Sequence, residues 1–248
     1  MAQGAQLIWD NLAWTPGNLS ASFDIDPSIP GNDVTIAISG NTPRFRSSLV
    51  SPNPATPAIT RAFDGGFNPG HDSLELALDL ANNTQAITVT LTFSALYATG
   101  VSNVSFKLFD IDYANADSAT YQDVVRSIKA TSTTGASIAP TITGVGPDLS
   151  LTGTGLTQVL TGTASTADTG AGSGRSNATI SFNSTAIQSV RFTYKSSSAF
   201  ADPSYQHIGI DNIKYSAVPE PSSSWSGFIG GATIMGLSFF RRLRRRVP

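Results

Sequence analysis

The stretch from Val104 to Asp112, which reads Val-Ser-Phe-Lys-Leu-Phe-Asp-Ile-Asp, decides the fold class. Its first apolar residues, at positions 104, 106 and 108, alternate with polar ones, as in a strand that buries one face. The alternation then shifts by one position, so Phe109 and Ile111 are expected on the opposite face. A shift of this kind within a strand predicts a β-bulge or a local twist.

A second stretch, from His207 to Tyr215, repeats this shift further along the chain. Aspartates lie at both changes of face: Asp110 and Asp112 in the first stretch, and Asp211 in the second. Carboxylate oxygens are ligands that Ca²⁺ prefers, so the three aspartates predict a structural calcium site if the two strands converge. The alternative is that they cap turns and keep strand ends soluble. No EF-hand-type loop accompanies them.

Alternation of apolar and polar residues recurs throughout the body of the chain, residues 1–217. Strands are predicted near residues 6–13, 19–25, 33–39, 74–80, 86–94, 103–111, 123–131, 156–163, 177–183, 187–195 and 207–215. Many strands without crossover helices predict an all-β fold, an antiparallel β-sandwich of the jelly-roll kind with less than about 10% helix. Residues 40–73 carry few strand signals and are predicted to form a long surface excursion.

The composition agrees with a turn-rich β protein. Of 248 residues, 32 are Ser and 27 are Thr, and only 13% are charged. The 40% of hydrophobic residues can bury a core, which argues against disorder. The chain contains no cysteine, so a disulfide framework, a Cys-ligated metal and a thiol nucleophile are excluded.

The formal net charge of −2 conceals an uneven distribution of charge. Residues 1–219 contain 10 basic and 16 acidic residues, which is a balance of −6. The other five basic residues are Arg241, Arg242, Arg244, Arg245 and Arg246. A nucleic-acid-binding protein would carry its positive charge on the folded surface, so an acidic body argues against a nucleic-acid partner.

Residues 218–248 form a tail of distinct blocks. Val-Pro-Glu-Pro at 218–221 and a Ser linker at 222–224 precede residues 225–240, which contain no ionisable side chain, and an Arg-rich end at 241–248. A helix of this apolar length would be about 24 Å long, slightly short of a ~30 Å hydrocarbon core. Snorkelling arginines can close the gap, so a single transmembrane helix is predicted, with its arginines in the cytoplasm and the body across the membrane. A buried core helix is the alternative.

The order and spacing of these blocks resemble the PEP-CTERM sorting signal of exported proteins in Gram-negative bacteria that make exopolysaccharide. The resemblance covers about 31 of the 248 residues. It implies that a membrane-embedded exosortase processes the tail and that the protein, first anchored in the inner membrane, reaches the cell surface or the extracellular matrix. The implied recognition motif is Val218, Pro219, Glu220 and Pro221. An export signal is expected as well, and the first residues, Met-Ala-Gln-Gly-Ala-Gln, do not look like one.

Phe-Asp-Ile-Asp in one strand and Ile-Gly-Ile-Asp-Asn-Ile in the last resemble extracellular β-sandwich domains of bacterial surface and adhesin-like proteins. This resemblance implies an exported protein with a structural or adhesive role in an exopolysaccharide matrix.

The alternative function is a carbohydrate-binding module, which needs exposed aromatic side chains on one sheet face or a rim. The candidates are Trp9, Trp14, Tyr97, Tyr113 and Tyr205, although core packing explains aromatic residues more often. A secreted hydrolase is the weakest reading, because no nucleophile, phosphate-binding or zinc-protease motif is present. Glu75 is the single glutamate of the body, and His71 and His207 are far apart in the sequence. The chain is therefore predicted not to be an enzyme, with structural Ca²⁺ as its one potential cofactor and polysaccharide as a potential partner.

Overall fold

The computed structural model describes residues 4–27, 30–66, 71–116, 119–165 and 174–218. The predicted transmembrane helix at 225–240 and the arginine cluster lie outside these residues, as do three of the four residues of the sorting motif. No helix within the described residues has the length and apolar character needed to cross a bilayer.

The described residues form seventeen strands, and every strand pairing is antiparallel. One layer contains β1 (Gly4–Leu7), β4 (Ala58–Thr60), β5 (Ser73–Leu78), β7 (Val101–Phe109), β11 (Thr141–Thr143), β14 (Ala178–Phe182), β16 (Gln206–Ile210) and β17 (Ile213–Ala217). The other contains β2 (Ser20–Phe23), β3 (Val34–Gly40), β6 (Ile87–Phe93), β8 (Tyr113–Ala116), β9 (Ala119–Ser132), β10 (Ser137–Ile138), β12 (Leu149–Thr152), β13 (Val159–Gly162) and β15 (Ile187–Ser196). The helical elements are three 3₁₀ turns, η1 (Trp9–Asn11), η2 (Thr42–Arg44) and η3 (Gly155–Thr157).

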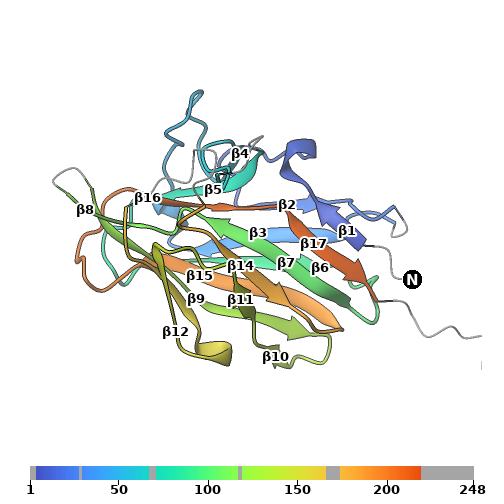
Figure 1. The fold of residues 1–248 in the computed structure, drawn as a ribbon. Coiled ribbons are helices and arrows are strands. Elements are labelled where there is room, and N and C mark those ends of the chain that lie inside the picture. Colours follow the sequence, from blue (N-terminus) through green and yellow to red (C-terminus); the bar gives the residue numbers. More distant parts are fainter. Residues whose placement is uncertain (1–3, 28–29, 67–70, 117–118, 166–173, 219–248) are drawn as a thin grey trace, which may run out of the picture. The chain divides into compact units, whose positions relative to one another are not determined.

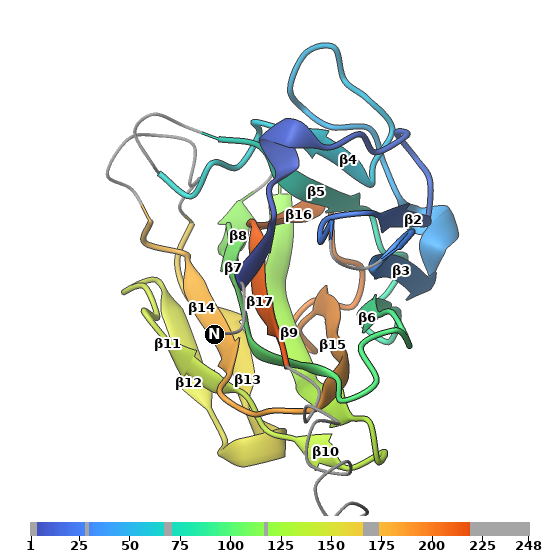
Figure 2. The ribbon, with the colours of Figure 1, turned by 90° about the vertical axis from the view of Figure 1, so that its right-hand side faces the viewer.

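Eight of these strands follow the interleaved order of a jelly roll (Figure 1). In the first layer β5, β16, β7 and β14 are neighbours, and in the second β6, β15, β9 and β13 are neighbours. We number these eight strands from 1 to 8 in chain order, as β5, β6, β7, β9, β13, β14, β15 and β16. Their order in the two layers is then 1-8-3-6 and 2-7-4-5, which is the double Greek key of a jelly roll. Figure 2 shows the layers from the side, with β7 and β14 on the left and β15 and β6 on the right. The all-β antiparallel prediction is confirmed, with 49% strand and 5% helix among the described residues.

The alternating sequence pattern explains how the layers bury their core. On β6 the four apolar residues are buried and the three threonines between them point outward. Facing residues of both layers form one large apolar cluster that includes Ile36, Leu91, Phe106, Val190 and Ile210. Burying a side chain of this kind is worth roughly 1.5–3 kcal/mol relative to leaving it exposed, so the period-two pattern supplies the main driving force for this fold.

The shifts of face predicted in the two decisive stretches are present, with one correction. Between Ile210 and Lys214 the register against β7 slips by one residue, which is a bulge at Asp211. On β7 the strand ends at Phe109, and Asp110 adopts a left-handed conformation with φ 58°. This reversal returns Ile111 to the main core, so its predicted place on the opposite face is wrong.

Two further predictions from the sequence need correction. Residues 9–11 form the turn η1, so the strand predicted at 6–13 is limited to β1. Within residues 40–73, β4 pairs with β5, and Ala58, Ala62 and Phe63 are buried. This segment therefore covers part of the first layer instead of forming a free surface excursion, because its few apolar residues cover polar positions of β5 and β16.

Candidate functional site

Asp110 and Asp112, two of the three predicted calcium ligands, lie next to the fully buried Asp123 of β9. Asp123 accepts a hydrogen bond from the backbone N–H of Asp112 at 3.1 Å and one from the Tyr194 hydroxyl at 2.7 Å. Burial raises the pKa of Asp123 well above its usual value, and the negative charge of Asp112 raises it further. The sequence did not single out Asp123, because its Gln-Asp-Val context follows the ordinary alternation of a strand.

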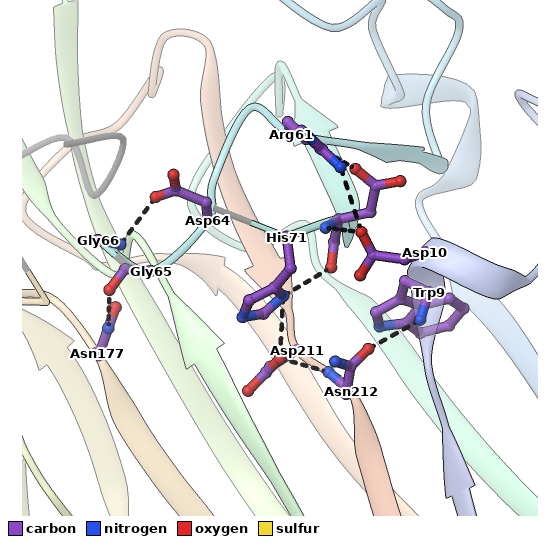
Figure 3. A network of polar contacts seen from close by, with 11 residues as sticks. Trp9, Asp10, Arg61, Asp64, Gly65, Gly66, His71, Asn177, Asp211 and Asn212 are labelled. Carbon is purple, nitrogen blue, oxygen red and sulfur yellow. Dashed lines mark hydrogen bonds and ion pairs between the residues drawn. The ribbon is translucent and has the colours of Figure 1, made fainter. Parts of the chain in front are cut away.

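Asp211, the third predicted ligand, has different partners at the bulge between β16 and β17 (Figure 3). Its Oδ1 lies 3.6 Å from Nδ1 of His71 and accepts a hydrogen bond from the backbone N–H of Asn212. Burial raises the pKa of Asp211, while that hydrogen bond and the charges of His71, Lys107 and Lys214 oppose the rise. Nowhere in the described part of the chain do three His, Asp or Glu side chains form a group that could hold a metal ion. The calcium site stays a prediction from the sequence.

The surroundings of His71 form a polar network at the surface of the first layer (Figure 3). Arg61 donates to Asp72 at 2.9 Å and forms a second ion pair with Asp10 at 3.4 Å. Arg61 is exposed over 65% of its side chain, so these pairs contribute little to stability. The network connects loop residues to η1, and both Arg61 and His71 lie beside carboxylates.

Beside this network, β5 and β16 carry polar side chains under a cover of apolar residues. Glu75 is fully buried, accepts a hydrogen bond from Thr60 at 2.8 Å and lies 3.6 Å from Nδ1 of His207. Phe63 packs edge-on against the His207 ring at a centroid distance of 4.6 Å. We call this region, where Phe63 and its neighbours lie over Glu75 and His207, the covered face. The one glutamate of the body is therefore shielded from solvent.

The aromatic residues proposed for carbohydrate stacking are mostly in the core. Trp9, Trp14 and Tyr97 are 0%, 6% and 4% exposed, so core packing, the alternative given for these residues, is confirmed for all three. Tyr205 is half-buried and donates its hydroxyl to the carbonyl oxygen of Ser47. Burial, with a further effect of the charge of Glu75, raises its pKa to about 12.

The fifth candidate, Tyr113, is half-buried against Phe200 at a ring-centroid distance of 5.8 Å. This aromatic pair lies at one end of the second layer, where β8 pairs with β9. Two partly exposed rings packed against each other present little flat surface for a sugar.

The outward surface of β2, β3, β6, β15 and β9, which we call the open face, has a different character. These five strands are consecutive neighbours, and their register aligns hydroxyl side chains across the sheet. One complete row, read from β2 to β9, is Ser22, Thr35, Thr92, Ser189 and Thr131. Adjacent strands lie about 4.8 Å apart, so the row is a regular line of hydroxyl groups across the layer.

Basic side chains occupy the β15–β9 half of the open face. Arg191 lies directly opposite Lys129, and Thr193 lies opposite Arg126. Lys195 follows on β15, and its pKa is lowered by burial and by the positive charge of Arg126. The only acidic residue in the five strands is Asp123, whose side chain is buried and not on this face. The open face therefore combines hydroxyl rows with an uncompensated positive patch.

The open face was not identified from the sequence, although part of its polar pattern can be read there. Residues 88–92 read Thr-Val-Thr-Leu-Thr and residues 191–195 read Arg-Phe-Thr-Tyr-Lys, so the outward positions of both strands are polar. Only the register shows that these strands are neighbours and that β9 adds two more cations beside them.

No protein-family model matches the chain, and no curated protein matches its sequence. Among solved structures, CBM28, a carbohydrate-binding module specific for non-crystalline cellulose, aligns at 12% identity with a TM-score of 0.36, covering 71% of this chain and 89% of its own. The family 11 carbohydrate-binding module of Clostridium thermocellum, in complex with a β-1,3-1,4-mixed-linked tetrasaccharide, aligns at 12% identity with a TM-score of 0.32, covering 88% and 98%. The N-terminal domain of the Streptococcus gordonii adhesin Sgo0707 aligns at 12% identity with a TM-score of 0.34, covering 77% and 43%.

Proposed function

We propose that this protein is an exported, non-enzymatic module that binds polysaccharide through its open face and is delivered by its C-terminal tail. The observation that carries the binding proposal is the alignment of outward hydroxyl groups over five neighbouring strands. A surface of this kind suits an extended polymer, which can contact several rows at once, better than a small molecule, which needs a concave site.

Polar contacts, and not ring stacking, would hold the polymer. The outward positions of the five strands carry no aromatic residue. Ser and Thr hydroxyls both donate and accept hydrogen bonds, as sugar hydroxyls do. A single exposed hydrogen bond contributes little, so binding would depend on many contacts along one chain.

The first test of binding changes hydroxyls without changing charge or strand propensity. Replacing Thr88, Thr90 and Thr92 of β6 together with Val removes one column of hydroxyl groups and keeps the β-branched shape. We expect the triple variant of the full-length chain, purified in mild detergent, to lose at least about threefold in affinity across a panel of soluble polysaccharides. The matched control replaces Thr141, Thr143 and Thr179 of β11 and β14 with Val and should bind as the wild type does. Equal losses in both variants, or no binding of any polysaccharide by the wild type, would refute the proposal.

The tail is proposed to act as a sorting address and a temporary anchor. Residues 225–240 have no ionisable side chain, so their insertion avoids about 2.5–3.5 kcal/mol for each charge at the bilayer centre. The five arginines that follow also favour anionic headgroups by about 1 kcal/mol each. This arrangement would leave Pro219, Glu220 and Pro221 on the outer side of the inner membrane, within reach of an exosortase.

The sorting proposal is tested in cells, with a signal peptide added at the N-terminus. We expect the chain to fractionate with membranes in a host that lacks the exosortase and to appear as a shorter form in a host that has it. Replacing Arg241, Arg242, Arg244, Arg245 and Arg246 with Ser should reduce membrane retention. An intact C-terminus in the exosortase-bearing host would refute the sorting proposal and leave the binding proposal unaffected.

A further inference from the structure

We infer that the polysaccharide recognised by the open face is acidic, with carboxylate or sulfate groups along its chain. This inference rests on the proposed function and adds the chemical class of its ligand. It starts from four basic residues of β9 and β15 that make no ion pair with any described residue: Arg126, Lys129, Arg191 and Lys195.

The placement of these residues works against the stability of the free protein. Arg191 and Lys129 are directly opposite on neighbouring antiparallel strands, where Cβ atoms are about 5 Å apart and like charges destabilise the pair. Arg126 lies close enough to Lys195 for its charge to lower the lysine's pKa. An anionic group between such residues would be attracted by several of them at once. The patch is thus arranged to bind negative charge.

Acidic partners are scarcer at the open face than in the rest of the described body, where Arg44 is the one arginine without an ion pair. Residues 1–219 contain 16 acidic and only 10 basic residues. Elsewhere, Arg46 pairs with Asp79 at 2.6 Å, and Arg175 pairs with Asp148 at 2.6 Å. Lys107 and Lys214, on the outer side of the first layer, both act on the Asp211 carboxylate. The body has more acidic than basic residues, and yet four basic side chains of the open face form no ion pair with a described residue. This contrast indicates that the open face is the anion-binding surface.

The observations favour a polysaccharide over a nucleic acid as the polyanion. Double-stranded DNA carries one charge per about 1.7 Å, and the acidic body would repel it at a distance. An acidic polysaccharide has fewer charges and many hydroxyl groups, which corresponds to four cations beside rows of Ser and Thr. The positive patch and the hydroxyl rows would then contact different groups of one polymer.

The experiment compares two forms of one polymer. Polygalacturonate and its fully methyl-esterified form share a backbone and differ in the carboxylate charge. The full-length chain in mild detergent, with a chelator present, should bind polygalacturonate at least about tenfold more tightly than the ester. Raising the salt from 0.05 M to 0.5 M should remove most of this difference, because surface charges are then screened. Dextran sulfate serves as the sulfate-bearing arm and should compete with polygalacturonate.

Two variants of equal net charge assign the effect to the open face. Replacing Arg126, Lys129, Arg191 and Lys195 with Gln should reduce polygalacturonate affinity at least about tenfold. The control replaces Arg44, Arg46, Arg61 and Lys214 with Gln and should lose less than about twofold. If the fourfold variant unfolds at a lower temperature than the wild type, the pair Arg126→Gln and Arg191→Gln is compared with Arg44→Gln and Lys214→Gln.

The outcomes separate the inference from the function on which it rests. Equal affinity for both forms of the polymer, or equal losses in the two variants, would overturn the acidic ligand and leave polysaccharide binding intact. Binding of neither form, and of no neutral glycan, would overturn the proposed function itself. Tighter binding of duplex DNA than of polygalacturonate at the same salt would overturn the inference in favour of a nucleic acid.

Discussion

The covered face and the open face are both formed by antiparallel strands, but they differ in where their polar side chains lie. Those of the covered face are largely buried, and those of the open face point to solvent. On the covered face Glu75 and His207 face each other at 3.6 Å beneath Phe63. On the open face Arg191 lies opposite Lys129, and neither forms an ion pair with a described residue. The ionisable groups of the covered face therefore lie against each other inside the protein. The four basic residues of the open face form no ion pair with a described residue, although Lys129 and Lys195 donate hydrogen bonds to Ser137 and to the carbonyl oxygen of Asn83.

The two faces contribute to different properties of the body: the covered face to its stability and the open face to the proposed binding. Burying polar groups is costly, and on the covered face the hydrogen bond from Thr60 to Glu75 and the packing of Phe63 on the His207 ring offset part of this cost. An exposed like-charge pair costs only a few tenths of a kcal/mol to about 1 kcal/mol, which a domain can tolerate. The faces should therefore respond differently to substitution.

The largest expected effect is on the covered face. Phe109 is fully buried against Ala62 and Phe63, and Phe109→Ala should lower the free energy of unfolding by about 3–5 kcal/mol. On the open face, Thr90→Ala should change it by no more than about 0.5 kcal/mol. Urea unfolding of both variants checks the contrast, and similar losses would show that the two faces do not differ in this way.

The buried Asp123 should make the stability of the wild type depend on pH. Its folded-state pKa is raised by burial, so its contribution to stability is present below the unfolded pKa of about 3.9 and is lost as the pH rises through the folded pKa. Asp123→Asn removes this titration. The variant should therefore gain stability relative to the wild type as the pH rises from about 4 to 8.

Unfolding of this variant by urea at several pH values measures the effect. Asp202→Asn, at an exposed loop position, is the matched control and should follow the wild type. A constant difference between Asp123→Asn and the wild type across this range would contradict the raised pKa.

A smaller effect is expected when the repulsion on the open face is relieved. Lys129→Glu places opposite charges across the β9–β15 pair and should raise the free energy of unfolding by about 0.2–1 kcal/mol. The same change should weaken binding of polygalacturonate. A variant that is both less stable and a better binder would contradict the account of the open face.

The smallest expected effect concerns calcium. If Asp110, Asp112 and Asp211 bind Ca²⁺ as the sequence predicts, an excess of calcium should raise the melting temperature, because a ligand bound only by the native state stabilises it. Magnesium at the same ionic strength is the control. Identical melting curves in calcium and in chelator would show that these aspartates serve only their protein partners.

Much of the fold follows from local alternation, as β6 and the bulge at Asp211 illustrate, because burial of one face dictates a period of two. The face of the layer on which the Ile111 side chain lies could not be predicted, because it depends on the left-handed conformation of Asp110. The sequence left the place of Trp9 open between core and surface, because its context does not reveal that the η1 turn directs it into the core.

The positive patch of the open face could not be predicted from local alternation either. Arg191 and Lys129 are 62 positions apart, and only the pairing of β15 with β9 places them side by side. A charge pattern within one strand can be read from the sequence, whereas a charge pattern across strands depends on long-range register.

The chain contains no cysteine, so one introduced thiol can report directly on whether the open face is the binding surface. Thr90→Cys places a thiol at the centre of the open face, and Thr179→Cys places one on the outer side of β14 in the other layer. The measurement is the rate of maleimide modification of each full-length variant, with and without saturating polygalacturonate. We expect the polymer to slow modification at position 90 several-fold and to leave the rate at position 179 unchanged. Protection at position 179 with none at position 90 would contradict it.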